Sequence, residues 1–363
     1  MERRNPSIAY YVSAHGYGHG VRSCDIVNAI NRLYPDLSVT VVTDLPVPFL
    51  RNRLASASNA FRPGSFDVGM VQRDSIRVDV PATWREVRAL LERKDGLVER
   101  EAAFIREEGI AAVVADVPAI PLEAARRAGV PAVAVGNFSW DWIYSEFAET
   151  EPAWKPVVRQ FEEGYALADL LLRLPFADEM KAFPRIEDIP LVASPGRDRR
   201  AELARLTGCR PGRKWVLLSF TSLELDEAAL DRIEKLTDYE FFTVRPLEWR
   251  RRNIHPVNRE QIPFSDVLAS ADAVVSKLGF GLMSECVVNG KPLVYADRSD
   301  FREYHVLVGG VKRCLKNVHV PRQNLYRGDL GAALEALWIA PEPPEKLAGG
   351  GAEVAAHRIA RFL

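Results

Sequence analysis

Residues 8–20 read IAYYVSAHGYGHG, and they decide how the first half of the chain is expected to fold. An apolar run of β-branched and aromatic residues comes first, and a turn with three glycines follows it. Residues 23–33 then carry apolar side chains at helical spacing, and residues 37–43 return to the strand pattern. Strand, glycine turn, helix and strand in this order make a βαβ unit, which predicts a parallel sheet.

A second, tighter βαβ unit follows along the chain. Residues 110–115 form a short apolar strand, residues 122–128 a helix ended by Gly129, and residues 131–135 another strand. The stretch 84–108 between the two units has helical spacing and many Arg and Glu residues, so we expect it to present a solvated helix face. The first half therefore predicts a doubly wound sheet.

The same architecture is expected again after a proline-rich stretch. Pro184, Pro190 and Pro195 interrupt the periodic pattern, and we place the interdomain linker there. Further strands are expected at residues 214–220, 239–244, 273–276 and 292–295. The chain is thus predicted to be an α/β protein with two doubly wound, Rossmann-like domains that face a cleft. The predicted parts are residues 1–180, residues 181–345, and a helix within residues 346–363 that packs back on the first domain.

Composition limits the partners of the protein. The chain carries 48 Lys and Arg against 49 Asp and Glu, a net charge of −1, so no overall field would attract it to nucleic acid. The four cysteines lack metal-ligand spacing and are expected to be reduced, buried thiols of a cytoplasmic protein. We expect no signal peptide and no transmembrane segment, while peripheral contact with a membrane and the oligomeric state stay open.

The turn at residues 15–20 lies between the first strand and the first helix, where an open α/β sheet binds ligands. Gly16 and Gly18 would let the backbone approach a ligand, and the helix N-terminus would attract an anion. The glycine spacing differs from the dinucleotide fingerprint, although Asp44 follows the second strand as that fingerprint requires. His19 can take up a proton near neutral pH, which makes it the first candidate for activating an acceptor. Alternatively, the glycines only form a turn and His19 only orients it.

Two carboxylates of the first half are further candidates. Residues 137–144, NFSWDWIY, follow a strand and combine aromatic rings, which stack on sugars, with the carboxylate of Asp141. Asp141 could hold a hydroxyl group or accept its proton, and Asp116 at the end of another strand could do the same. Alternatively, these aromatic side chains belong to the core or to packing between domains.

In the second half, residues 276–285, SKLGFGLMSE, again place a glycine-bearing turn between a strand and a helix. The N–H groups of this turn and Lys277 could face a diphosphate, and Glu285 could accept the two hydroxyl groups of a ribose. Alternatively, Glu285 is an ordinary acid of a helix N-terminus. Polar loops after neighbouring strands would emerge at the same sheet edge. The candidate nucleotide-sugar residues of this half are Ser219, Thr221, Ser222, Arg245, Lys277, Gly279, Phe280, Gly281, Ser284, Glu285, Arg302 and Glu303.

These features together resemble glycosyltransferases of the GT-B fold. Four phrases, YVSAHGYGH at 11–19, NFSWD at 137–141, RLP at 173–175 and KLGFG at 277–281, are similar to the N-terminal, glycosyltransferase-like region of plant L-arabinokinases. The likeness covers almost the whole chain, but no sugar-kinase phosphate loop is present, so sugar phosphorylation is not expected.

A more distant resemblance is to the cell-wall UDP-N-acetylglucosamine transferase family of bacteria. It implies that residues 279–281 border the diphosphate and that Glu285 holds the ribose. It also implies that Arg302 and Glu303 contact the donor sugar, with His19 near the reacting centre. That family carries neutral amides where Arg302 and Glu303 stand.

The predicted function is transfer of a sugar from a nucleoside-diphosphate sugar, UDP-linked by resemblance, to a small-molecule, lipid or glycan acceptor. His19 is the expected base, with Asp141 and Asp116 as rivals, and Lys277 or Arg245 would stabilise the leaving diphosphate. The chain offers no Asp-x-Asp motif at a strand end, so we expect no metal and no further cofactor; inversion at the anomeric carbon is expected. The alternatives are a sugar-nucleotide epimerase of the same fold and a non-catalytic, sugar-nucleotide-binding regulatory module.

Overall fold

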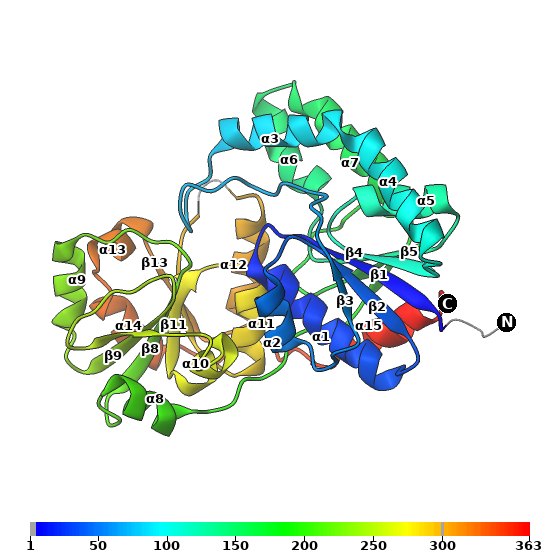
Figure 1. Cartoon of the computed structure of the whole chain (residues 1–363). Helices are drawn as coiled ribbons and strands as arrows, with labels where there is room; N and C mark the ends of the chain where they lie inside the picture. Colours follow the sequence, from blue (N-terminus) through cyan, green and yellow to red (C-terminus); the bar gives the residue numbers. More distant parts are fainter. Residues whose placement is uncertain (1–4, 299–300) are drawn as a thin grey trace. The chain divides into compact units, whose positions relative to one another are not determined.

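A computed structural model describes residues 5–298 and 301–363, and the chain divides into two compact units (Figure 1). Unit 1 consists of the described residues up to Val71, Asp79–Ala193 and Ala348–Leu363. Unit 2 consists of Ser194–Leu347 together with the short segment Gln72–Val78. Each unit has its own parallel sheet and its own hydrophobic core.

The sheet of unit 1 has seven strands among the described residues, in the order β3-β2-β1-β4-β5-β6-β7. All neighbouring strands are parallel, and the order reverses between β1 and β4, as in a doubly wound sheet. The strands are β1 Ser7–Val12, β2 Ser38–Val42, β3 Ala60–Arg62, β4 Ala112–Asp116, β5 Ala132–Gly136, β6 Leu170–Arg173 and β7 Ile186–Asp188.

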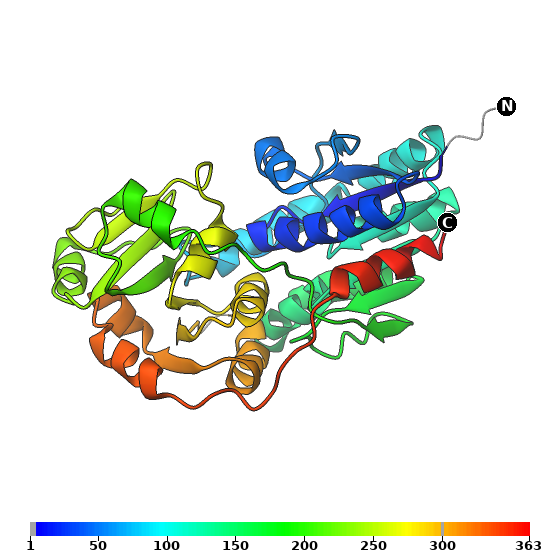
Figure 2. The same ribbon diagram turned by 90° about the horizontal axis from the view of Figure 1, so that it is seen from below.

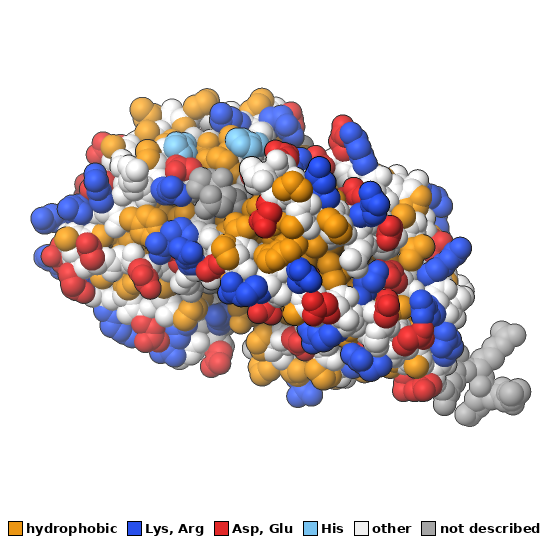
Figure 3. All heavy atoms as spheres, turned by 90° about the horizontal axis from the view of Figure 1, so that it is seen from above, with side chains coloured by type: hydrophobic (Ala, Val, Ile, Leu, Met, Phe, Trp, Pro, Cys, Tyr) orange, Lys and Arg blue, Asp and Glu red, His pale blue; other side chains and the backbone are white. Residues whose placement is uncertain are grey.

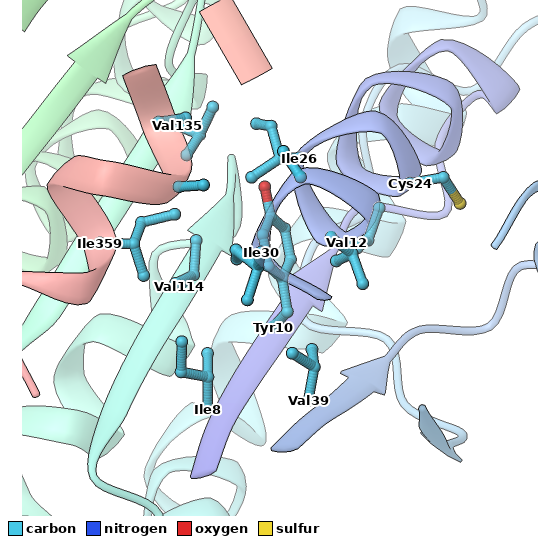
Figure 4. Close-up of a cluster of buried hydrophobic side chains, with 14 of the residues drawn as sticks. Ile8, Tyr10, Val12, Cys24, Ile26, Ile30, Val39, Val114, Val135 and Ile359 are labelled. Carbon is cyan, nitrogen blue, oxygen red and sulfur yellow. The ribbon is translucent and has the colours of Figure 1, made fainter. Parts of the chain in front are cut away.

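Helices cover both faces of this sheet (Figure 1). On one face, α1 Tyr17–Leu33 and α15 Gly351–Ala360 lie side by side (Figure 2). Ile8 and Tyr10 of β1, Ile30 of α1 and Ile359 of α15 are fully buried in one cluster (Figure 4). Burying one Ile side chain stabilises a fold by about 2 kcal/mol. The cluster therefore holds the C-terminal helix on the first unit.

The other helices of unit 1 follow the strands in turn. Asp79 caps α3 by accepting a hydrogen bond from the N–H of Ala82, and Gly129 at φ 79° ends α5 in the left-handed region. These helices are α2 Val47–Arg53, α3 Val80–Glu92, α4 Lys94–Glu107, α5 Ile120–Ala128, α6 Trp140–Thr150 and α7 Trp154–Tyr165.

Unit 2 has a parallel sheet of six described strands, in the order β10-β9-β8-β11-β12-β13, which reverses between β8 and β11. Its core gathers apolar side chains from β8, β9 and β11, among them the fully buried Val216, Phe241 and Val275. The strands are β8 Lys214–Ser219, β9 Tyr239–Val244, β10 Ile254–Val257, β11 Ala273–Lys277, β12 Leu293–Ala296 and β13 Asn317–Val320. The helices are α8 Arg200–Thr207, α9 Glu227–Glu234, α10 Phe264–Ser270, α11 Phe280–Val288, α12 Glu303–Cys314, α13 Arg322–Arg327 and α14 Gly331–Ile339.

The first helix begins earlier than the periodicity indicates. It starts at Tyr17, so Gly18, His19 and Gly20 form its first turn and do not belong to a loop. Gly20 packs under two apolar side chains: a Cβ added there would lie 2.6 Å from the ring of Phe49 and 2.7 Å from Leu45. A larger residue at this position would displace the side chains of Phe49 and Leu45, and the small size of glycine lets α1 and the segment after β2 approach each other.

The charged stretch 84–108 differs from its prediction in two ways. It forms two helices, α3 and α4, which meet at Arg93. One of its acids, Glu101, is buried and not solvated, because its carboxylate accepts hydrogen bonds from the hydroxyl of Tyr11 at 2.9 Å and from the guanidinium of Arg62 at 2.6 and 2.8 Å. A buried charge of this kind is tolerated only when it is paired.

The predicted linker also contains structure. β6 and β7, which lie on either side of Pro184, both pair within the sheet of unit 1. The boundary between the compact units therefore lies between Ala193 and Ser194, later than the predicted 180/181. The segment Gln72–Val78, which the sequence places inside the first domain, packs with unit 2.

Candidate functional site

In unit 1, the candidate residues gather where the strand order reverses. Val12 of β1 and Asp116 of β4 are register partners at the carboxyl ends of their strands. In an open α/β sheet, ligands bind in the crevice outside this point, because the loops of the two strands diverge to opposite faces there. The loop after β1 leads through His15 and Gly16 into α1, so the first turn of α1 stands over the end of β4.

A buried network of polar side chains fills this position. The Nδ1 atom of His19 lies 2.9 Å from Oδ1 of Asp116. Arg22 donates to both oxygens of the same carboxylate, from Nε at 2.7 Å and from Nη2 at 2.5 Å, and the hydroxyl of Ser23 donates to it at 2.8 Å. His19, Arg22 and Ser23 lie on one face of α1 because three and four residues make about one helical turn.

Asp116 is the fixed negative centre of this network. Burial alone would raise the pKa of its carboxyl group, but the charge and hydrogen bonds of Arg22, supported by those of His19, hold the pKa well below its usual range. Asp116 is 0% exposed. It is therefore a permanent carboxylate without access to a ligand, and it can position His19 but cannot reach a substrate.

The arrangement determines which nitrogen of His19 can act. A carboxylate only accepts hydrogen bonds, so the proton on Nδ1 points to Asp116 and the lone pair remains on Nε2. Nη2 of Arg22 also approaches Nδ1, at 3.0 Å, but an Nδ1 that carries its proton toward Asp116 has no lone pair left to accept a hydrogen bond. His19 is 8% exposed. With Nδ1 oriented in this way, Nε2 can take a proton from a bound hydroxyl group.

The loop that follows β4 is held in a strained conformation next to this pair. Val117 has φ 83°, in the left-handed region that a β-branched residue rarely adopts and that costs about 1–3 kcal/mol. The hydroxyl of Tyr165 donates to its carbonyl oxygen at 2.9 Å and accepts the N–H of Trp140 at 3.2 Å. Tyr165 thus ties the end of β4 to the start of α6.

The segment 137–144 is core and not an open stacking surface. Phe138, Trp140 and Tyr144 are buried, and Trp140 and Tyr144 stack on each other with ring centroids 5.6 Å apart. Phe138 contacts the ring of His19 edge-on, at 5.7 Å between centroids. These aromatic rings therefore form the apolar wall behind His19, as the alternative interpretation of this segment holds.

A second buried carboxylate, Asp67, lies on the same side of unit 1. Trp140 donates to it from Nε1 at 2.9 Å, and burial raises its pKa, against the hydrogen bonds of Trp140 and Ser13 and the charge of His19. Two residues later, Gly69 at φ 71° places its backbone against His15, where a Cβ would lie 2.0 Å from the imidazole Nδ1. The N–H of Met70 donates to that same atom at 3.3 Å.

Asp141 stands apart from the His19 network. It lies in the first turn of α6, it is 8% exposed, and no hydrogen bond within the described structure reaches its Oδ1. Burial raises the pKa of this carboxyl group to about 6, although Ser139 and the N–H of Trp142 lower it. The structure does not bring Asp141 into contact with His19, and its burial leaves it little access to an acceptor.

In unit 2, the strand order reverses between β8 and β11, and Ser219 and Ser276 are register partners at their ends. The hydroxyl of Ser276 donates to the carbonyl oxygen of Ser219 at 2.6 Å. Gly279 then starts α11 from an extended conformation, and no heavy atom of the described residues would lie within 4 Å of a Cβ added to it. The same holds for Gly16 at the start of α1. Both helix N-termini are thus open to a bound anion.

Lys277 supplies a cation beside the start of α11. The residue is only partly covered, but its ammonium group is desolvated, and this burial together with the charge of Arg298 lowers the pKa to about 7, against Glu303 and Asp74, which raise it. Arg298 belongs to the polar loop 297–303, which was predicted to read sugar hydroxyls because it follows the strand next to β11. Arg298 is buried and lies 3.6 Å from the carboxylate of Glu303.

The other predicted residues of unit 2 differ in their availability. Thr221 and Ser222 are exposed, whereas Glu285 and Phe280 are buried. The hydroxyl of Ser284 donates to the carbonyl oxygen of Phe280 at 2.9 Å. Arg245 is half-exposed after β9, two strands from β11, and pairs with Glu248 at 2.8 Å. Gly281 lies inside α11, and Arg302 and Glu303 start α12. Ser299 and Asp300 of the predicted polar loop lie outside the described residues.

Three wider properties of the described residues concern membranes, metals and surface charge. None of the helices in 5–298 and 301–363 combines the length and the apolar character needed to cross a bilayer. Within the same ranges, no three His, Cys, Asp or Glu side chains group as metal ligands would. On the face shown in Figure 3, basic and acidic side chains alternate and no extended patch of one sign is formed.

The comparisons with known proteins identify the fold. No known protein-family model matches the chain. The L-arabinokinase of Arabidopsis thaliana is 28% identical over 356 residues, which are 96% of this chain, and this chain spans about one third (34%) of the length of that relative. The predicted resemblance to plant L-arabinokinases is thus confirmed.

Solved glycosyltransferases share the fold over the full chain. The glycosyltransferase of kitacinnamycin has a TM-score of 0.66 at 18% identity and covers 99% of this chain and 100% of its own. UGT89C1 of Arabidopsis thaliana, solved with quercetin, has a TM-score of 0.63 at 16% identity and covers 99% of both chains. The calicheamicin glycosyltransferase CalG4 has a TM-score of 0.60 at 16% identity and covers 100% of this chain and 94% of its own. The chain has the GT-B glycosyltransferase fold.

Proposed function

We propose that this chain is a glycosyltransferase that moves a sugar from a UDP-sugar to a hydroxyl group of an acceptor. The observation that carries the proposal is the His19–Asp116 pair at the reversal point of the unit 1 sheet. A histidine whose Nδ1 is held by a buried carboxylate presents Nε2 as a base, and a transferase needs such a base for the acceptor. Structures of the same fold were solved with UDP and with UDP-L-rhamnose, which supports the choice of donor.

The reaction follows from these groups. Nε2 of His19 takes the proton of the acceptor hydroxyl as its oxygen forms a bond to the anomeric carbon. The bond from that carbon to the diphosphate breaks, and UDP leaves with the electron pair. Attack from the face opposite the leaving group inverts the anomeric carbon. Asp116 stays ionised and stabilises the imidazolium that forms, while Arg22 keeps Asp116 in place.

The leaving diphosphate is stabilised by unit 2. The open N-terminus of α11 at Gly279 offers backbone N–H groups and the positive end of the helix dipole, and Lys277 adds a cation. Binding of the anion favours the charged form of Lys277, whose pKa burial has lowered to about 7. These groups supply the charge that a metal supplies in other transferases, so we propose that the reaction is metal-independent.

Exposed aromatic surface beside the proposed base suits an acceptor with a flat apolar face. Tyr17, the first residue of α1, is 37% exposed and packs edge-on against Phe49 with centroids 5.0 Å apart. UGT89C1 was solved with quercetin, an aromatic molecule that such a surface would fit. We propose an aromatic or otherwise flat acceptor.

The test combines binding with turnover. In a thermal-shift screen, UDP and UDP-sugars should stabilise the protein. A ligand at a concentration of one hundred times its dissociation constant should add about 2.7 kcal/mol. Activity is then measured as the release of UDP from the UDP-sugar that binds, beginning with water alone as the acceptor. His19→Ala should lower this rate by about 10²- to 10⁴-fold and leave the Kd of UDP unchanged.

His357→Ala is the matched control, because His357 is an exposed histidine of the same unit and bonds only to Tyr34 among the hydrogen bonds of the described residues. Equal loss of activity in both variants, or full activity of His19→Ala, would overturn the assignment of the base. Binding without turnover in the wild type would indicate a regulatory module, and conversion of one UDP-sugar into another would indicate an epimerase.

A further inference from the structure

The segment Gln72–Val78 is a short hairpin from the first half of the chain that packs with unit 2. Gln72 and Val78 form an antiparallel bridge, and the N–H of Arg73 donates to the carbonyl oxygen of Arg77 at 2.9 Å. Chain on both sides of the hairpin belongs to unit 1. The hairpin is therefore a segment of the first half of the sequence that belongs to the compact unit formed mainly by the second half.

The tip of this hairpin holds the loop after β8. The N–H of Ser75 donates to the carbonyl oxygen of Ser222 at 3.0 Å, and the N–H of Ser222 donates back to the hydroxyl oxygen of Ser75 at 3.0 Å. The same hydroxyl group lies 3.2 Å from Oγ1 of Thr221. Ser75 is 1% exposed, whereas Thr221 and Ser222 are exposed. The buried serine thus fixes two residues that face solvent.

Two neighbours of Ser75 anchor the hairpin. Ile76 is fully buried in the hydrophobic cluster of unit 2. The carboxylate of Asp74 accepts the N–H groups of Ile76 and Arg77 at 2.8 Å each, and the hydroxyl of Tyr326 on α13 donates to it at 2.9 Å. A core side chain and a capped turn hold the tip in one conformation, so Ser75 has little freedom to move away from the loop.

The place of the held loop gives the hairpin its role. Thr221 and Ser222 follow β8, and β8 pairs with β11, whose end carries Lys277 and the open start of α11. The negative charge of Asp74 acts on Lys277 as well, which places the hairpin at this same sheet edge. A hairpin that served only to tie the chain together would not need its buried serine turned toward an exposed polar loop.

We propose that the hairpin Gln72–Val78 is a part of the nucleotide-sugar site and that Ser75 is the residue that positions Thr221 and Ser222 for the diphosphate. This inference rests on the proposed function of unit 2. It assigns to the first half of the sequence a contribution to donor binding, made through the conformation of the loop and not by contact of Ser75 with the nucleotide. The whole chain is needed for the donor site, because residues 194–347 alone lack the hairpin.

The experiment measures UDP binding to full-length variants by calorimetry. Ser75→Ala removes the hydroxyl that accepts the N–H of Ser222, and we expect the Kd of UDP to rise about five- to tenfold, the equivalent of one hydrogen bond. Hydrogen exchange followed by mass spectrometry should show faster exchange at residues 220–222. Tyr326→Phe, which loosens the hairpin through Asp74 only, should raise the Kd in the same direction by a smaller factor.

Ser270→Ala is the matched control. Ser270 is a buried serine of unit 2 whose hydroxyl oxygen accepts the N–H of Arg199 at 2.7 Å, so its removal costs a similar hydrogen bond elsewhere. A Kd that is unchanged in Ser75→Ala, or raised equally in Ser270→Ala, would overturn the inference and leave the proposed function standing. A wild-type protein that binds neither UDP nor any UDP-sugar would overturn the proposed function and this inference with it.

Discussion

Replacing Asp141 with Asn should make the protein more stable at alkaline pH and less stable in acid. The carboxyl group lies in the first turn of α6, it is 8% exposed, and its Oδ1 receives no hydrogen bond within the described structure. Burial raises its pKa from 3.8 to about 6. A buried carboxylate that lacks a cationic partner opposes folding once it is ionised, because the unfolded chain solvates the charge better.

The magnitude follows from this pKa. The folded pKa lies above the unfolded one, so the carboxyl group does not destabilise the fold below about pH 3, destabilises it progressively between about pH 3 and 6, and destabilises it by a constant amount above that range. At 1.36 kcal/mol per pH unit, the constant amount is about 3 kcal/mol. Asn avoids this cost but gives up hydrogen bonds worth about 1 kcal/mol at every pH. Asp141→Asn should therefore gain about 2 kcal/mol at pH 8 and lose about 0.5 kcal/mol at pH 4.

Urea unfolding followed by tryptophan fluorescence, from pH 4 to pH 8, measures the difference between variant and wild type. Groups common to both cancel in this difference, which should change by about 2.5 kcal/mol across the range. Asp95→Asn is the control, since Asp95 occupies the first turn of α4 and is exposed. A difference that stays constant with pH would refute the argument.

The same variant distinguishes between the candidate bases. Asp141→Asn should release UDP from a UDP-sugar at close to the wild-type rate, because the proposed base is His19. A loss of turnover as large as that of His19→Ala, at unchanged UDP affinity, would assign the proton transfer to Asp141 instead.

Three further predictions concern the two candidate sites. Asp116→Asn should lower the free energy of unfolding by about 3–5 kcal/mol at pH 7, because Arg22 would stay buried without its carboxylate. The pKa of Asp116 is lowered in the folded state, so the stabilities of variant and wild type should converge in urea unfolding as the pH falls below about 4. A stability difference that does not change with pH would contradict this prediction. Gly69→Ala should lower the melting temperature and the turnover, because a Cβ added at φ 71° would lie 2.0 Å from the ring of His15. A variant that behaves like the wild type in both assays would contradict this prediction. The affinity for UDP-glucose should fall as the pH rises from 6 to 8, because the cation of Lys277 is lost near pH 7, and calorimetry of Lys277→Met should show weaker binding without this slope.

Much of the fold is predictable because it depends on local patterns. The strand β9 has the predicted bounds Tyr239–Val244, and β4, β5, β8, β11 and β12 differ from theirs by one or two residues. All are short apolar runs between helices, which in a parallel sheet buried on both faces need no other signal. β6 lies within the predicted first domain but was not predicted as a strand, and β7 was placed in the second domain. Both are short and lie among prolines, so that only the pairing of β6 with β5 and of β7 with β6 shows where they belong.

The sequence predicted where the candidate site lies but not the hydrogen bonds that connect its residues. His19 and Asp116 could be selected because both follow strands, and the carboxyl ends of parallel strands meet at one edge. Arg22 and Ser23 were missed because the helix was expected to begin at residue 23, so that His19 would have lain in a loop outside it. Once α1 is known to start at Tyr17, their spacing from His19 places them on its face.

The sequence by itself determined that this protein has two parallel α/β sheets and that glycine-bearing turns stand at the ends of their strands, because periodicity and turn chemistry act over a few residues. Only the tertiary structure decided what each charged group does. It turned Asp116 into a buried anchor, left Oδ1 of Asp141 without a hydrogen bond from the described residues, and moved the hairpin Gln72–Val78 into unit 2. Burial and pairing depend on residues about a hundred positions apart in the chain or more, such as Arg22 and Asp116 or Ser75 and Ser222, and no local pattern records them.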